Sequence, residues 1–253
     1  MAENSSDNKM TRRQFLRNSG YVAGGVVGGG LVGGIVGNQM QSGGAPTQEK
    51  PGGKSEKTPQ FDHALMYFSQ KEDFDVLSQA TELIFPADEL GPGAIELGVP
   101  YYIDKQLAGA WGHNAKEYMQ GPFFEGEPTQ GYQSRLQRHE IFSQGIRKMK
   151  EYSQKKFNAP FLDLEEDQQI DILTAFEKGD IELAGVPNEQ FFALLRAATL
   201  EGAYADPLYG GNQNMEGWKM KEYPGNKMAY HDVIDSDKFY DEPPSSLHSH
   251  MDK

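Results

Sequence analysis

Apolar side chains in this sequence recur every three or four positions through much of its length, which is the spacing of one face of an α-helix. Alternation of apolar and polar residues, which marks strands, is rare, and β-branched residues are few outside residues 21–36. The helical pattern covers five segments: 69–86, 101–107, 132–157, 163–179 and 187–202. We therefore expect an all-α protein, with a single irregular multi-helix domain behind an N-terminal segment of different character.

Residues that begin and end helices stand at the edges of these segments. Ser69 with Glu72, and Asp163 with Glu166, have the spacing of a capping box, in which each side chain bonds the other residue's backbone. These pairs predict the starts of two helices. Further boundaries are expected at Pro86, Pro100, Tyr132, Phe157, Gly179, Pro187 and Gly202.

Composition divides the chain into four parts. Residues 1–45 contain a basic start and a glycine-rich apolar run, and residues 46–60 form a flexible linker of Gly, Pro, Ser and Lys. Residues 61–229 carry the helical pattern, and within them residues 109–131 have no clear period and predict an ordered aromatic loop. Residues 230–253 are acidic and contain prolines, so a mobile tail is expected.

The N-terminal segment resembles a twin-arginine export signal. Arg12 and Arg13 follow a threonine and precede Phe15 and Leu16, and the weakly apolar residues 21–36 come next. That stretch is short for a membrane-spanning helix, which needs about twenty apolar residues. We expect export in the folded state by the twin-arginine translocase, to the periplasm or cell envelope. A chance basic pair is the alternative interpretation, and both cleavage and retention as a membrane anchor stay open.

The run Gly28-Gly29-Gly30-Leu31-Val32-Gly33 matches the glycine pattern of dinucleotide-binding loops. That pattern requires a preceding strand, a following helix and an acidic residue about twenty positions later. None of these is convincing in the sequence, so we interpret the match as an accident of the glycine-rich segment.

Charge and cysteine content narrow the classes of function. The formal net charge is −13, which disfavours binding to nucleic acid because the phosphate backbone is also negative. The chain has no cysteine, which excludes disulfides and thiolate-bound iron–sulfur clusters in it. Its six histidines show no metal-binding spacing, so no metal site is predicted.

The densest group of turn residues runs from Gly202 to Gly225. It reads Gly202-Ala203-Tyr204-Ala205-Asp206-Pro207-Leu208-Tyr209-Gly210-Gly211-Asn212, then Gly217-Trp218-Lys219-Met220 and Tyr223-Pro224-Gly225. This stretch resembles the C-terminal signature of the gluconate 2-dehydrogenase small-subunit family. Ile84-Phe85-Pro86-Ala87-Asp88, Gly91-Pro92-Gly93-Ala94 and Tyr102-Ile103-Asp104 resemble the N-terminal block of the same family. Together the matches frame most of residues 61–225.

The resemblance implies an accessory role. Members of the family accompany a large FAD-dependent flavoprotein of the glucose-methanol-choline (GMC) oxidoreductase type, and often a cytochrome c subunit that accepts the electrons. The small subunit is thought to carry the flavoprotein through twin-arginine export and to stay bound. The resemblance thus implies no catalytic residue and no cofactor in this chain, FAD in the partner, and gluconate or a related sugar acid or sugar as substrate.

Eight signature residues are candidates for contact with the partner. As structure, the loop would cap the helix that ends at Gly202; as function, it would present an aromatic and hydrogen-bonding surface. Both interpretations stay open. The candidates are Asp206, Pro207, Tyr209, Gly210, Gly211, Asn212, Gly217 and Trp218.

Two functions from other classes are alternatives. The first is a self-sufficient exported enzyme, such as a hydrolase that uses Asp206, although no nucleophile or base lies near Asp206 in the sequence. The second is a structural protein of the cell envelope, held at the membrane by residues 21–36.

Overall fold

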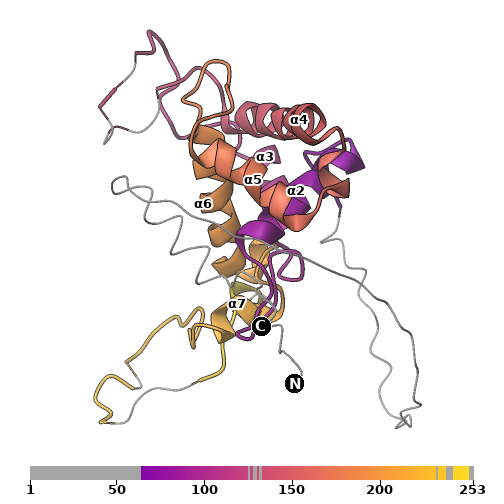
Figure 1. The fold of residues 1–253 in the computed structure, drawn as a ribbon. Coiled ribbons are helices and arrows are strands. Elements are labelled where there is room, and N and C mark those ends of the chain that lie inside the picture. Colours follow the sequence, from indigo (N-terminus) through magenta and orange to yellow (C-terminus); the bar gives the residue numbers. More distant parts are fainter. Residues whose placement is uncertain are drawn as a thin grey trace, which may run out of the picture.

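A computed structural model describes residues 64–124, 126–127, 130, 133–231, 233–237 and 242–250. Regular structure in this part is helical, apart from two isolated β-bridges, which confirms the all-α prediction (Figure 1). The residues of the predicted export signal, Arg12, Arg13, Phe15 and Leu16, lie outside the described residues, as does the linker 46–60. The α-helices are α2 (Lys71–Ile84), α3 (Val99–Ala108), α4 (Arg138–Phe157), α5 (Glu166–Glu177), α6 (Gln190–Tyr204) and α7 (Glu216–Lys219), and the 3-10 helices are η3 (Phe161–Asp163), η4 (Pro207–Tyr209), η5 (Gln213–Met215) and η6 (Leu247–His250).

Helix α6 forms the centre of the domain, because α2, α3, α4 and α5 all contact it. In Figure 1, α4 lies across the top and α6 runs down from it toward α7. The buried Phe191 ring of α6 packs edge to face against Phe142 of α4 and Phe176 of α5, at centroid distances of 5.7 and 5.1 Å. These aromatic contacts account for the apolar stripes seen in the sequence.

Two of the predicted helix starts are wrong by one or two residues. Helix α2 begins at Lys71 after Gln70, which makes no side-chain cap, so the Ser69–Glu72 box does not form. Helix α5 begins at Glu166 after Glu165, and Gln168 Oε1 accepts the Glu165 N–H at 3.2 Å. Asp163 instead lies in η3, because the chain makes a further turn before α5. The Gly179 stop is confirmed, with φ of 74° one residue after the C-cap.

Helix α4 begins at Arg138, later than the start predicted at Tyr132, which itself lies outside the described residues. The Ser134 hydroxyl donates to the Gly185 carbonyl at 2.7 Å and accepts the Leu136 N–H at 2.9 Å. This holds the chain in a bend before the helix. Glu140 then caps the helix by accepting the Gln137 N–H at 2.8 Å.

A buried carboxylate on α3 fixes the segment that leads into α2. Asp104 is fully buried and accepts the backbone N–H groups of Met66, Tyr67 and Phe68, at 2.6, 3.1 and 2.9 Å. Charge-assisted hydrogen bonds of this kind are about twice as strong as neutral ones. Asp104 therefore joins the start of the described chain to the middle of the domain.

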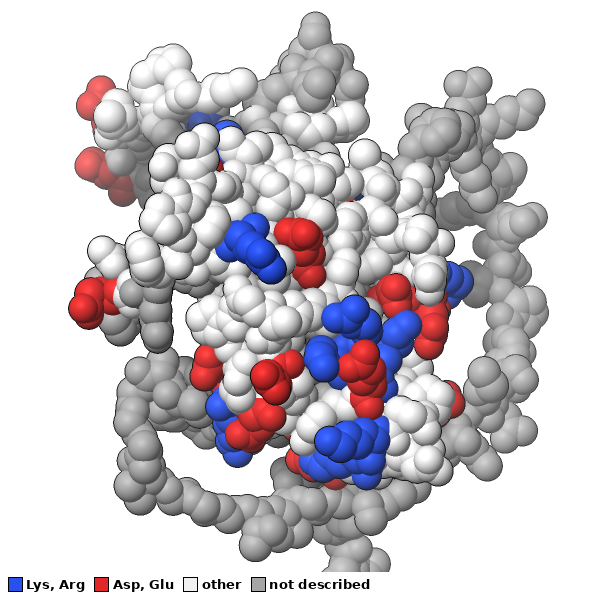
Figure 2. Space-filling view, turned by 90° about the horizontal axis from the view of Figure 1, so that it is seen from above, with Lys and Arg blue, Asp and Glu red and all other residues white. Residues whose placement is uncertain are grey.

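The outer face of α4 carries basic side chains that are largely matched by acidic ones. Lys150 binds Asp73 at 2.7 Å, and this hydrogen bond raises the pKa of Lys150. Figure 2 shows basic and acidic side chains interspersed on the face seen from above. Further ion pairs join Arg147 and Lys148 to Glu151, and Lys156 to Asp171.

Among the described helices, none combines the length and the apolar composition that crossing a lipid bilayer requires.

Candidate partner-binding site

The signature residues follow α6 and form a loop, residues 205–225, that folds back on the end of that helix. We call it the signature loop. Asp206 caps η4: its Oδ1 accepts the Leu208 N–H at 3.0 Å, and its Oδ2 accepts the Leu247 N–H at 2.8 Å. Both carboxylate oxygens thus bind backbone groups. This is the role of a capping residue and does not favour the hypothesis that Asp206 is a catalytic acid.

Asn212 closes the loop from inside. It is fully buried in the left-handed conformation, with φ of 47°. Its side-chain N–H donates to the Ala205 carbonyl at 2.8 Å, and its side-chain oxygen accepts the Gly217 N–H at 2.7 Å. One side chain therefore satisfies two backbone groups that a buried loop would otherwise leave unpaired.

Two glycines allow the loop to lie directly on the last turn of α6. A Cβ at Gly217 would lie 1.9 Å from the Ala203 carbonyl oxygen, and one at Gly211 would lie 2.2 Å from that of Gly202. Because the obstructing atoms are backbone, no side-chain rotation would relieve the overlap. These positions require glycine for close approach.

Trp218 completes this packing from α7. Its indole N–H donates to the Tyr204 carbonyl at 2.8 Å, and its buried ring packs edge to face against Tyr223 at 5.4 Å. Together Asn212, Gly217 and Trp218 bind the end of α6. The structural interpretation of these residues is thus well supported by their contacts, whereas contact with a partner stays a prediction for them.

The exposed part of the signature loop lies around η4, where Tyr209 is half-exposed beside Tyr102 of α3. Burial, followed by the negative charge of Glu201 and by Tyr209, raises the pKa of Tyr102 to about 12. Burial also raises the pKa of Glu201. Tyr102 of α3, Glu201 of α6 and Tyr209 of η4 therefore lie near one another at this edge of the domain.

Residues 245–250 pack against the signature loop, although they belong to the tail that was expected to be mobile. We call them the C-terminal segment. Ser245 pairs with Gly225 in a parallel β-bridge, since its carbonyl accepts the Asn226 N–H at 2.7 Å and its N–H donates to the Pro224 carbonyl at 3.1 Å. With the Leu247–Asp206 bond, this places residues far along the tail on the signature loop.

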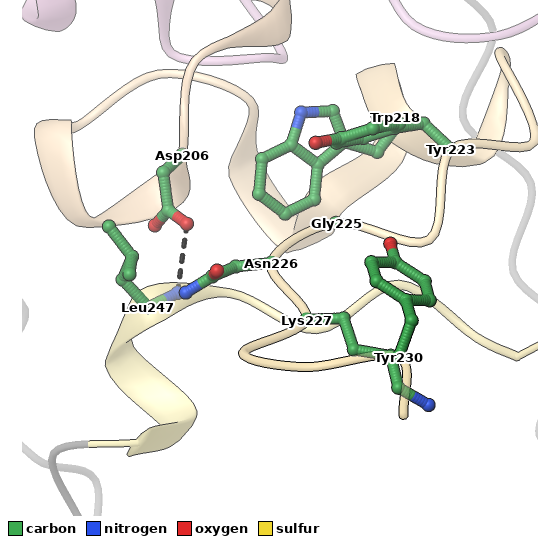
Figure 3. Close-up of a pocket in the computed structure, with 8 residues that line it drawn as sticks. All are labelled: Asp206, Trp218, Tyr223, Gly225, Asn226, Lys227, Tyr230 and Leu247. Atoms are coloured by element: carbon green, nitrogen blue, oxygen red, sulfur yellow. Dashed lines mark hydrogen bonds between the residues drawn. The ribbon is translucent and has the colours of Figure 1, made fainter. Parts of the chain in front are cut away.

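A shallow cavity of about 340 Å³ lies between the signature loop and the C-terminal segment. Figure 3 shows Trp218, Tyr223 and Tyr230 on one side of it and Asp206 with Leu247 on the other. This volume is at the small end of the range for ligand pockets.

A second cluster, which the sequence did not reveal, joins His113 and His139. Their rings lie 4.5 Å apart, and the Gln137 side-chain oxygen lies 3.3 Å from His113 Nδ1 and 2.8 Å from His139 Nε2. Burial, and then the neighbouring His113, lower the pKa of His139. Among the described residues, no group of three or more His, Cys, Asp or Glu side chains is placed to hold a metal ion.

Sequence reasoning also missed the roles of Asp104 and Asn114. Asn114 is buried with φ of 50°, and its side-chain oxygen accepts the Arg138 N–H at 2.9 Å. An asparagine inside a glycine- and tryptophan-containing loop is a signal that could have pointed to it. For Asp104, a carboxylate between the apolar residues Ile103 and Leu107 of one helix was the available signal.

Comparisons with known proteins give one positive result. No curated protein and no solved structure matches the chain. The family model described as gluconate 2-dehydrogenase subunit 3 matches residues 71–225, which is more than half of the chain and spans α2 to the Gly225 turn. The chain therefore belongs to the gluconate 2-dehydrogenase subunit 3 family.

Proposed function

We propose that this chain is the non-catalytic small subunit of an exported, FAD-dependent dehydrogenase of the gluconate 2-dehydrogenase type. The observation that carries the proposal is the family match over residues 71–225, since the name of the family is that of a subunit of a larger dehydrogenase. In this proposal the large partner is a GMC-type flavoprotein that holds FAD and oxidises a sugar or sugar acid. A cytochrome c subunit would accept the electrons.

The chemistry of the signature loop supports a binding role more than a catalytic one. Both Asp206 oxygens accept backbone N–H groups, and Asn212 and Trp218 bond backbone carbonyls of α6 and the residue after it. Polar groups used in this way position a loop and are not available to move protons in a reaction. The alternative of a self-sufficient enzyme is therefore less well supported.

The proposal assigns export to the N-terminal segment. A flavoprotein that loads FAD in the cytoplasm needs a route for folded cargo, and Arg12-Arg13 would supply it to both chains together. The complex would then work on the outer side of the cytoplasmic membrane, either released or held there by residues 21–36.

The test is immunopurification of the chain from its native cells, followed by a visible spectrum and a dye-linked assay with gluconate and related sugars. We expect a large flavin-containing protein to co-purify, with dehydrogenase activity in the complex and none in the chain alone. Replacing Arg12 and Arg13 by Lys should leave both proteins in the cytoplasm. A colourless, solitary chain after gentle purification would contradict the proposal and favour an envelope protein.

A further inference from the structure

Residues 226–231, 233–237 and 242–244 lie between two fixed points of the chain; we call them the C-terminal loop. The Gly225–Ser245 bridge closes its base, and the hydrogen bond from Leu247 to Asp206 holds the chain just beyond it. Inside the loop, Lys227 lies 3.8 Å from Glu242 and stacks over the Tyr230 ring at 5.6 Å. The loop is therefore presented from a defined base on the signature loop.

Apolar side chains on this loop face solvent to an unusual extent. The exposed fractions are 73% for Met228, 47% for Tyr230 and 74% for Ile234. Tyr230 also lines the cavity beside Trp218, so the exposed side chains adjoin a hollow with aromatic walls (Figure 3). Met and aromatic residues are enriched at protein interfaces, and exposed apolar groups beside a pocket mark binding surfaces.

The charge of the C-terminal loop indicates what kind of surface it would meet. Its described residues include three carboxylates and one lysine: Asp235, Asp237 and Glu242 against Lys227. An excess of acidic side chains in the same segment as exposed apolar ones is complementary to an apolar patch accompanied by Lys and Arg. A membrane of anionic lipid would repel it.

We propose that the C-terminal loop is the element by which this chain docks on its flavoprotein, with Met228, Tyr230 and Ile234 as anchors. The inference rests on the proposed function and refines it. It assigns contact with the flavoprotein to the C-terminal loop, whereas the buried signature residues hold that loop in place. The occupant of the surface is a basic-rimmed apolar patch of the flavoprotein, and one of its side chains fills the aromatic cavity.

A second exposed apolar region provides the matched control. Tyr118 and Phe124, before α4, are 80% and 72% exposed, which is comparable to the proposed anchors. If exposure alone drove association, truncating them would weaken the complex as much as truncating the anchors.

The experiment compares four full-length chains expressed in the native cells: the wild type, Met228→Ser/Tyr230→Ser/Ile234→Ser, Tyr118→Ser/Phe124→Ser, and Asp235→Asn/Asp237→Asn. Each is immunopurified, and flavin absorbance per mole of chain is measured at increasing salt. We expect the anchor variant to retain at least about tenfold less flavoprotein, equivalent to about 1.4 kcal/mol, and the control to match the wild type. Asp235→Asn/Asp237→Asn should make binding less sensitive to salt. Thermal unfolding of each purified chain checks that the exposed substitutions leave the fold intact.

The outcomes separate the inference from the function on which it rests. If the wild type and the anchor variant retain equal amounts of flavoprotein, the proposal that the C-terminal loop is the docking element is wrong. The proposed function as a subunit is not affected by that result. Loss in the Tyr118/Phe124 variant alone places the interface near that loop and also overturns the inference. If no flavoprotein co-purifies with the wild-type chain, both the docking proposal and the proposed function are wrong.

Discussion

The loop after α3, of which the structure describes residues 109–124, 126–127, 130 and 133–137, and the signature loop after α6 use the same devices to lie against their helices. Each has one of the two tryptophans of the chain, a buried left-handed asparagine, and a glycine pressed on a carbonyl of the preceding helix. A Cβ at Gly112 would lie 2.0 Å from the Leu107 oxygen, much as Gly217 faces Ala203. The pairs are Trp111 and Trp218, Asn114 and Asn212, and Gly112 and Gly217.

The two loops differ in what their asparagine joins. Asn212 bonds Ala205 and Gly217 within its own loop, whereas Asn114 accepts the N–H of Arg138, at the start of the next helix. The Arg138 guanidinium in turn lies 5.0 Å from the centre of the Trp111 ring. In the signature loop the asparagine and its partners lie close together in the sequence, so they form a short recognisable motif. In the loop after α3 the partners are farther apart in the sequence, so no short motif contains them. The same physical device is therefore recognisable as a motif in one loop only.

The largest effect is expected from adding a methyl group at the two pressed glycines. Gly217→Ala and Gly112→Ala should each lower the free energy of unfolding by about 3 kcal/mol, because backbone must move to relieve the overlap. Chemical denaturation measures both. Gly109→Ala is the control, since its Cβ would lie 3.3 Å from the nearest atom. If Gly217→Ala lowers the free energy of unfolding only slightly and Gly112→Ala lowers it strongly, the two loops are not packed on their helices in the same way.

Truncating the asparagines should have the next largest effect. Asn212→Ala leaves two backbone groups without partners in a buried site, at a cost of about 2 kcal/mol. Asn114→Ala should cost about half as much, because it removes the partner of one backbone N–H and not of two backbone groups. Replacing each asparagine by glycine also removes the side-chain hydrogen bonds, but glycine adopts positive φ without strain. The difference between the Ala and Gly variants therefore measures the cost of the positive φ. Equal losses at both sites would remove the distinction between the two loops.

Asp206→Ala tests whether the signature loop holds the C-terminal segment. It removes the acceptor of the Leu208 and Leu247 N–H groups, so hydrogen exchange at Leu247 and Asn226 should accelerate about tenfold or more. Exchange in the loop after α3 should not change. The cost in global stability should be about 1 kcal/mol. Unchanged exchange at Leu247 would mean that the β-bridge alone holds the segment.

The smallest effect concerns Tyr102, which links α3 to the signature loop. Its pKa is about 12 in the folded protein, against about 10 in an unfolded chain. The folded state therefore holds this proton more tightly, and the stability it contributes is complete below about pH 10 and is lost as the pH rises toward 12. Tyr102→Phe should reduce the alkaline fall of the melting temperature, and Tyr118→Phe, at an exposed site, is the control. Equal alkaline curves for Tyr102→Phe and the wild type would contradict this coupling.

The helices were predictable because their apolar period is a local property of the sequence. Their starts were less predictable. Glu165 replaces Asp163 as the N-cap of α5 by pairing with the nearby Gln168, which is a second local capping pattern. Ser134 delays α4 through a bond to Gly185, which is distant in sequence. The signature loop was identified from its dense turn residues. The carboxylate of Asp104, the His113–His139 pair and the docking of Ser245 all depend on tertiary contacts, which no local pattern encodes.

The Gly225–Ser245 bridge also determines how the C-terminal loop tolerates changes in length. With both ends fixed, the entropy of closing a flexible loop grows only with the logarithm of its length, so doubling the loop would cost about 0.6 kcal/mol. Insertions between these residues should therefore leave the helices almost undisturbed. A flexible segment without the bridge would lose far more conformational freedom on meeting a partner, so the bridge lowers the entropic cost of association in advance.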